Sequence, residues 1–310
     1  MKNETKIAVM EALEQFMELH QVSANKVAAK TGISSSYISI MRSGATTIKV
    51  RGKEVEIQNK YYEQIASFCN FQLQKNYWAP RHTDQSTRIL TTLEDAKEYG
   101  YTNVIIGEMG CGKTYTARLF GQNYPMDFFM VTVGSQDFIN DMLNKLLAVL
   151  KIKTQVKSKS GRIGVIVNHL KNMKLKGMKP LIYFDESEYM KQSMLCSMKE
   201  LYDHLNGVCG IVLGGTDQLT RNIDKLRKRN KEGIPQLYRR IKFGIRQLPI
   251  IDRNFKIFLN DYEKPLQRFL KENCENYGEL HDVLVPALRE ADRTGEPLTE
   301  EFIKLVLGIR

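Results

Sequence analysis

Apolar positions in residues 1–71 recur mostly at helical spacing. Every third or fourth residue is apolar between positions 5 and 20, which predicts an amphipathic helix, and residues 61–71 predict another. Between them, residues 23–41 predict two helices that turn at Gly32, with Ser34 as the cap of the second, in the manner of a helix-turn-helix. The alternative is a plain pair of antiparallel helices. Residues 47–57 alternate around Arg51-Gly52-Lys53, which predicts a hairpin or wing.

Short apolar runs alternate with helical patterns from residue 104 onward. The runs lie at 104–106, 128–133, 181–184, 210–216 and 244–250. They predict an α/β fold, with a parallel five-stranded sheet and flanking helices over residues 88–250. The pattern is helical only from residue 251, which predicts a small helical lid over 251–310 with a helix start at Thr299. We expect an all-α N-terminal domain over 1–71 and a linker over 72–87, where periodicity is lost.

A glycine-rich loop follows the first of these strands. Residues 107–114 match the pattern G-x-x-x-x-G-K-[ST] in the strand–loop–helix context that it requires. The glycines allow backbone N–H groups to face a phosphate, Lys113 supplies a cation for the β- and γ-phosphates, and the Thr114 hydroxyl is suited to Mg²⁺. The sequence therefore predicts that the chain binds ATP with Mg²⁺. The expected nucleotide-binding residues are Gly107, Glu108, Met109, Gly110, Cys111, Gly112, Lys113, Thr114 and Tyr115.

Two carboxylates end the apolar run at 181–184. Asp185 and Glu186 come about 70 residues after the glycine-rich loop, which is the order found in P-loop ATPases. We expect Asp185 to hold Mg²⁺, directly or through water. Glu186 is expected to polarise the water that attacks the γ-phosphate.

Cys111 lies inside the phosphate-binding loop. Neighbouring N–H groups and the start of the next helix would favour its thiolate, so one hypothesis places a reactive thiol against bound phosphates. The alternative hypothesis is an inert small residue.

Positive charge is concentrated in the α/β segment. The net charge of +11 divides into +3 for residues 1–80, +11 for 81–250 and −3 for 251–310. Residues 142–184 contain no acidic residue, and a second basic cluster spans 221–242. A surface of one sign favours a polyanion, and we predict double-stranded DNA as the partner. The expected DNA-binding lysines are Lys151, Lys153, Lys157 and Lys159.

The second helix of the predicted helix-turn-helix offers few residues that discriminate between bases. It presents Ser35, Ser36, Tyr37 and Arg42, of which only the arginine is suited to bidentate contact with a base. We therefore expect these residues to bind DNA with weak sequence preference.

The remaining composition is that of an ordinary globular protein. The five cysteines form no C-x-x-C pair, no apolar run approaches the ~20 residues of a membrane span, and the N-terminus leads into no apolar segment. We expect no membrane association, and a location in the cytoplasm of a bacterial or phage-infected cell.

The order of these features resembles that of AAA+ ATPases of DNA transposition. The shared features are the helix-turn-helix, the linker, the 107–114 loop, the strand ending in Asp185-Glu186 and the short helical lid. The resemblance implies that Thr216 is a polar sensor and that Arg240, with Arg239 as a close rival, is an arginine finger for a neighbouring subunit. Many such lids carry a sensor arginine where this chain has His281, and a mostly neutral histidine does not replace a permanent cation.

The resemblance implies a DNA-dependent ATPase that forms a helical filament or ring on target DNA. Such a protein hydrolyses ATP and delivers the DNA to a transposase or activates that enzyme. Two alternatives share the ATPase core: a helicase loader, and a transcriptional regulator in which the ATPase is a switch. A loader would be expected to carry a helicase-interaction segment, and a regulator to carry stronger base readers than this serine-rich helix.

Overall fold

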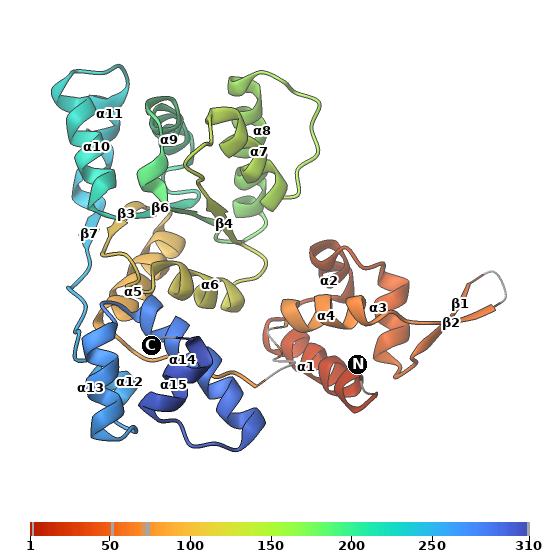
Figure 1. Ribbon diagram of the computed structural model, residues 1–310. Helices are drawn as coiled ribbons and strands as arrows, with labels where there is room; N and C mark the ends of the chain where they lie inside the picture. Colours follow the sequence, from red (N-terminus) through yellow and green to blue (C-terminus); the bar gives the residue numbers. More distant parts are fainter. Residues whose placement is uncertain (2, 51–52, 70, 72–74, 309–310) are drawn as a thin grey trace. The chain divides into compact units, whose positions relative to one another are not determined.

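The computed structural model describes the chain except for residues 2, 51–52, 70, 72–74 and 309–310. It divides into two compact units, Met1–Asn76 and Tyr77–Arg310. Each unit has its own set of helices and strands (Figure 1).

The N-terminal unit is helical apart from one hairpin. Its helices are α1 (Asn3–Leu19), α2 (Ala24–Thr31), α3 (Ser35–Arg42) and α4 (Asn59–Phe68). The predicted turn is confirmed: Gly32 has a φ of 79°, and the Ser34 hydroxyl accepts a hydrogen bond from the Tyr37 N–H at 3.3 Å. The predicted hairpin is also confirmed, with β1 (Thr47–Val50) antiparallel to β2 (Lys53–Glu56). Its expected turn at Arg51-Gly52 lies outside the described residues.

A buried lysine joins the hairpin to α1. Lys6 is 3% exposed, and its ammonium donates to Glu56 at the end of β2 over 2.8 Å. This hydrogen bond lowers the pKa of Glu56. The ammonium also lies 5.4 Å from the centre of the Tyr62 ring on α4. Lys6 therefore links three elements of the unit.

The second unit is built on a parallel sheet in the order β4-β5-β6-β3-β7. The strands are β3 (Thr102–Ile106), β4 (Phe128–Thr132), β5 (Leu181–Asp185), β6 (Gly210–Gly215) and β7 (Ile245–Gln247). Each of the five lies within or beside the apolar run that predicted it. The strand before the phosphate-binding loop, β3, lies between β6 and β7, and β6 separates it from the strand that ends in Asp185. Their carboxyl ends share one edge of the sheet, where ligands bind in open α/β folds.

Helices cover both faces of this sheet (Figure 1). One face packs on α7 (Ile139–Val149), α8 (Lys159–Leu175), α9 (Gln192–Leu205), α10 (Asp217–Lys228) and α11 (Ile234–Ile241). The other face packs on α5 (Asp84–Tyr99), α6 (Lys113–Asn123) and the lid helices. Alternate strand residues face the two cores: Val104 and Ile106 lie in the first, and Ile105 in the second.

Four helices form the lid over its described residues, 251–308. They are α12 (Lys256–Leu259), α13 (Lys264–Asn273), α14 (Tyr277–Thr294) and α15 (Glu300–Leu307). The predicted helix start is confirmed, because the Thr299 hydroxyl accepts a hydrogen bond from the Phe302 N–H at 3.2 Å. No helix in the described part of the chain is both long and apolar enough to cross a membrane.

Helix α5 begins inside the range that the sequence assigned to a linker. Thr83 and Ser86 form a reciprocal capping box, with hydrogen bonds of 3.0 and 2.9 Å between the side chain of each and the backbone N–H of the other. The Gln85 amide donates to the Ile250 carbonyl at 2.9 Å, which fixes this helix start to the chain beyond β7. Residues 84–87 are therefore part of the second unit.

Candidate nucleotide site

The phosphate-binding loop joins β3 to α6. The Gly107 N–H donates to the Gly215 carbonyl at 3.1 Å, and Gly110 and Gly112 have φ angles of 68° and 89°. Glycine adopts such angles without strain, whereas most other residues do not, so the loop depends on these positions. The Lys113 ammonium donates to the carbonyls of Gly107 at 2.9 Å and Glu108 at 2.8 Å. The loop therefore brings a cation and the N-terminus of an 11-residue helix together.

Thr114 and Asp185 meet across the sheet edge. The Thr114 hydroxyl donates to the Asp185 carboxylate at 2.8 Å, and Asp185 is 2% exposed. Burial raises the pKa of Asp185, against the Thr114 hydrogen bond and the charges of Lys113 and Arg118. Mg²⁺ commonly takes only one or two protein oxygens and completes its shell with phosphate and water. These two side chains fit that donor set.

Glu186 follows Asp185 in a left-handed conformation. Its φ is 54°, which is uncommon for a residue with a side chain and occurs at functional sites. The side chain is exposed, and its pKa is raised by desolvation and then by the charges of Asp185 and Glu188, with Lys145 opposing. A raised pKa moves a carboxylate toward the range of a general base at neutral pH.

Thr216 lies at the end of the neighbouring strand. It is partly exposed and immediately precedes α10. Thr216 follows β6, which lies between β3, the strand before the phosphate-binding loop, and β5, the strand that ends in Asp185. The polar sensor role that the resemblance implied for Thr216 stays a prediction.

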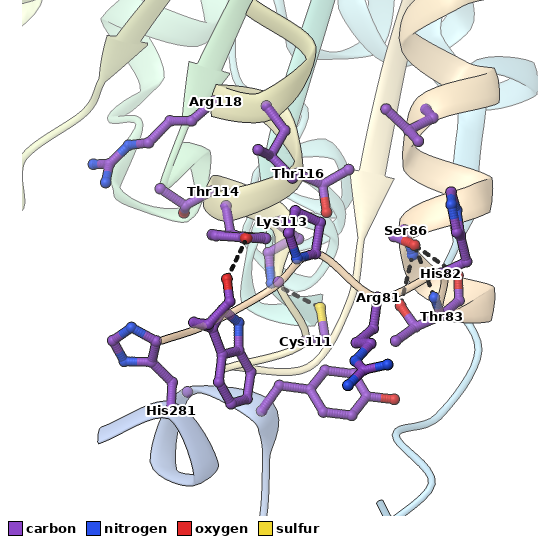
Figure 2. Close-up of a pocket in the computed structure, with 18 of the residues that line it drawn as sticks. Arg81, His82, Thr83, Ser86, Cys111, Lys113, Thr114, Thr116, Arg118 and His281 are labelled. Atoms are coloured by element: carbon purple, nitrogen blue, oxygen red, sulfur yellow. Dashed lines mark hydrogen bonds between the residues drawn. The ribbon is translucent and has the colours of Figure 1, made fainter. Parts of the chain in front are cut away.

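A pocket of about 500 Å³ adjoins the phosphate-binding loop. Figure 2 shows Lys113 and Thr114 at its centre, Arg81, His82 and Thr83 on one side, and His281 of the lid on the other. Further lining residues include Trp78, Ser86, Leu90, Phe258 and Tyr277. Its size and position beside the loop suit the nucleoside part of a nucleotide. The sequence interpretation missed this wall, because residues 78–83 have no periodicity and follow no phosphate motif; the only tryptophan was the available signal.

The lid contacts the loop directly. A Cβ added at Gly110 would lie 2.0 Å from the Asn276 amide oxygen, which caps the start of α14. Arg253 donates to the Glu108 carboxylate at 3.2 Å. His281, on the first turns of α14, lines the pocket and lies 2.9 Å from the Asp282 carboxylate. The position that lacks the sensor arginine therefore does reach the site.

The other loop residues differ in exposure. Met109 is 77% exposed, and the Tyr115 hydroxyl donates to the Trp78 carbonyl at 3.4 Å. Cys111 is 2% exposed, and burial raises the pKa of its thiol despite the nearby Lys113. Cys111 packs in the core beneath the loop, which favours the alternative of an inert small residue over a reactive thiolate.

The two candidate finger arginines lie on α11 and differ in their contacts. Arg240 donates to Asp203 at 2.6 Å and to the Gln236 carbonyl at 2.9 Å, and it is 18% exposed. Arg239 is exposed, and the described residues show no hydrogen bond or ion pair to its side chain. Neither lines the pocket of its own chain. The sequence could not separate the two, because Asp203 is 37 residues from Arg240.

The expected DNA-binding residues fall in two places. Lys151, Lys153 and Lys157 lie between α7 and α8, Lys159 begins α8, and all four are exposed. In the N-terminal unit, Ser35 and Ser36 are exposed at the start of α3, and Tyr37 is half-buried against Tyr61 with 5.2 Å between ring centres.

The sequence predicted that Arg42 is available to contact a base, but in the structure its side chain is paired. Its guanidinium donates to both carboxylate oxygens of Glu14 on α1, one of them at 2.9 Å. Since the fork that would contact a base is already paired, base contact requires this ion pair to open.

Comparison with known proteins identifies the core of the second unit. Residues 97–223 match the family model described as an AAA domain. The structure is similar to that of Cdc6p from Pyrobaculum aerophilum, with a TM-score of 0.52 and 13% identity over 81% of this chain and 68% of that chain. This likeness shows a shared fold. No curated protein matches the sequence.

Two further solved structures have lower scores. The structure of Drosophila ORC bound to DNA gives a TM-score of 0.45, at 10% identity over 88% of this chain and 73% of that chain. The Thermotoga maritima RuvB Holliday junction branch migration motor gives 0.40, at 13% identity over 74% and 70%.

Proposed function

We propose that this protein, whose second unit has a P-loop AAA+ fold, binds ATP, hydrolyses it on DNA and delivers the DNA to a transposase or activates that enzyme. The observation that carries the ATPase part is the meeting of Lys113, Thr114 and Asp185 at one sheet edge, with a hydrogen bond of 2.8 Å between Thr114 and Asp185. The pocket of about 500 Å³ beside them suits the nucleoside.

Each residue of the site has a distinct role. Lys113 and the N–H groups of the loop bind the β- and γ-phosphates, and Thr114 and Asp185 hold Mg²⁺, which neutralises phosphate charge when bound. Glu186 accepts a proton from the attacking water, and Thr216 orients that water or the γ-phosphate. The aromatic wall of the pocket excludes solvent from the base.

Replacing Glu186 with glutamine is expected to slow ATP hydrolysis by about a hundredfold and to leave ATP binding intact, because the amide keeps the shape but accepts no proton. Steady-state phosphate release and a separate binding titration measure the two effects. Glu188→Gln is the matched control, since Glu188 is the carboxylate two residues further along. Hydrolysis at the wild-type rate in Glu186→Gln, or a larger loss in Glu188→Gln, would contradict the assignment.

The DNA part of the proposal rests on charge and on the N-terminal unit. The α/β segment carries +11, and residues 142–184, which include the exposed lysines between α7 and α8, contain no acidic residue. In the N-terminal unit, α2 and α3 are joined by a turn at Gly32, but α3 is poor in base readers. Phosphate contacts are therefore proposed to supply most of the affinity.

Charge reversal at Lys151, Lys153, Lys157 and Lys159 is expected to reduce the dependence of DNA affinity on salt. Log affinity falls with log salt by about 0.9 for each phosphate contact on duplex DNA, so the slope should become shallower by up to about 3.6. Fluorescence anisotropy on two unrelated duplexes at several salt concentrations measures it. Charge reversal at Lys256 and Lys264 in the acidic lid is the control. An unchanged slope, or affinity that depends strongly on duplex sequence, would contradict this DNA surface.

A role in transposition is a more specific proposal than ATP hydrolysis on DNA. It is supported by the order of a helical N-terminal unit, an ATPase and a small helical lid along one chain. Pull-down of candidate transposases with the full-length protein, with ATP and DNA present, tests it. A protein that instead protects one defined DNA site, and loses that footprint when residues 1–76 are deleted, would be a transcriptional regulator.

Subunit contact completes the proposed site. We propose that ATP favours a homo-oligomer on DNA, a filament or a ring, in which an arginine of α11 reaches the γ-phosphate of the next subunit. The sequence favoured Arg240 for this role. The Arg240–Asp203 pair favours Arg239 instead, because an exposed arginine reaches a neighbour without first breaking an ion pair.

A further inference from the structure

The segment from Tyr77 to Thr83 belongs to the nucleotide pocket and also joins the two units. The N-terminal unit ends at Asn76, and Trp78 lines the pocket two residues later. Pro80, Arg81, His82 and Thr83 line it as well, and α5 begins at Asp84. The only covalent connection to the N-terminal unit therefore runs along the pocket wall.

Residues of several helices contact this segment. The Trp78 ring stacks on Phe258 of α12 at 4.9 Å and 14°, and lies 5.3 Å from the His281 ring, edge to face. Its carbonyl accepts the Tyr115 hydroxyl of α6 at 3.4 Å. Tyr77 donates to Asp292 of α14 at 2.8 Å. The segment therefore contacts α6 and the lid helices α12 and α14, and the Trp78 ring lies at the surface of the pocket.

We propose that Trp78 stacks on the base of the bound nucleotide and thereby transmits nucleotide occupancy to the N-terminal unit. The inference rests on the proposed nucleotide site. Aromatic rings bind bases through their π-faces with little dependence on sequence, and an indole offers the largest such face. A nucleotide that stabilises the docked position of Trp78 fixes the point at which the N-terminal unit is attached. By linkage, DNA bound through that unit then alters nucleotide affinity by the same factor.

Intrinsic fluorescence tests the first step. Trp78 is the only tryptophan in the chain, so emission reports on this ring alone. Titration of the full-length protein with ATP or ADP and Mg²⁺ is expected to change the emission saturably, with the same midpoint as binding measured by calorimetry. Binding seen by calorimetry with unchanged emission would overturn the Trp78 inference and leave the ATPase proposal standing. Absence of binding in calorimetry would overturn the nucleotide site itself.

Substitution tests the second step. The ratio of DNA affinities with and without ATP is expected to be about tenfold in the wild type, to approach one in Trp78→Ala, and to be largely restored in Trp78→Phe. Tyr99→Ala is the matched control, because Tyr99 is a 57% exposed aromatic residue that stacks on Tyr101, which also lies outside the pocket. ATP binding by calorimetry is measured for each variant, so that loss of coupling is separated from loss of nucleotide.

Hydrogen exchange provides a readout that does not depend on DNA. Amides of residues 77–83 are expected to exchange more slowly when ATP is added to the wild type, and to show no such change in Trp78→Ala. Two results would overturn the proposal that Trp78 transmits nucleotide occupancy to the N-terminal unit. One is a wild-type ratio of DNA affinities with and without ATP in Trp78→Ala; the other is hydrogen exchange at residues 77–83 that does not change when ATP binds to the wild type.

Discussion

Replacing Lys113 with alanine is expected to abolish ATP binding at millimolar nucleotide, and with it stable assembly on DNA. The ammonium lies within 2.9 Å of two loop carbonyls, so it is held at the place where phosphate oxygens enter. Two hydrogen bonds to charged groups are worth about 1.5–3 kcal/mol each, which corresponds to a loss of about a hundredfold to ten-thousandfold in affinity. Calorimetric titration with ATP and Mg²⁺ measures the loss directly.

A matched control separates this effect from unfolding of the loop. Lys97→Ala removes a lysine from α5 in the same unit. The Lys97 ammonium pairs at 2.5 Å with Asp127, the residue that directly precedes β4. That variant is expected to lower the thermal midpoint and to keep ATP binding, whereas Lys113→Ala should keep the thermal midpoint and lose binding. ATP affinity within threefold of the wild type in Lys113→Ala would contradict the phosphate site.

Replacing Arg239 with alanine is expected to reduce DNA-stimulated ATP hydrolysis by about a thousandfold, with little change in ATP binding. An arginine finger supplied by a neighbouring subunit acts on the charge that develops in the transition state, and its loss costs at least this much in turnover. Arg240→Ala is the control, and its effect is expected to be much smaller because Arg240 is held by Asp203. Turnover at saturating ATP, with DNA present, measures both variants.

Mixing variants tests whether the arginine acts between subunits. Subunits with Arg239→Ala keep an intact site, and subunits with Glu186→Gln keep an intact arginine, so mixed oligomers contain complete sites. Hydrolysis is therefore expected to recover on mixing, up to about a quarter of the wild-type rate for equal amounts and random neighbours. No recovery, or an equal loss in Arg240→Ala, would contradict the choice of Arg239.

The sequence predicted the elements of the ATPase well because their signals are local. The apolar runs that became β3 to β7 and the loop at 107–114 each depend on neighbouring residues, and the caps at Ser34 and Thr299 act over three residues. The carboxylate pair after β5 was found for the same reason. Parallel strands then bring their ends together without further information.

What the sequence could not predict are contacts between distant residues. Glu14 and Arg42 are 28 residues apart, and Asp203 and Arg240 are 37 apart, so the local pattern showed two free arginines where the structure has ion pairs. The residues next to Cys111 left a reactive thiol and an inert small residue open, because its burial depends on core residues that are distant in the sequence. The segment 77–83 lacked periodicity because its residues pack on the lid and not on a regular element of their own.

The contact between Gly110 and Asn276 also constrains how this sequence can vary. Asparagine is the usual replacement for glycine at a φ of 68°, but at position 110 any Cβ would lie 2.0 Å from the Asn276 oxygen. Shortening Asn276 would make room and would remove the cap that accepts the Glu279 N–H at 3.0 Å. The first change alone produces this clash, and the second alone loses a helix cap that is typically worth about 1 kcal/mol, so positions 110 and 276 are expected to be non-additive in a double-mutant cycle. A substitution in the loop can then persist only in a background where the lid has already changed.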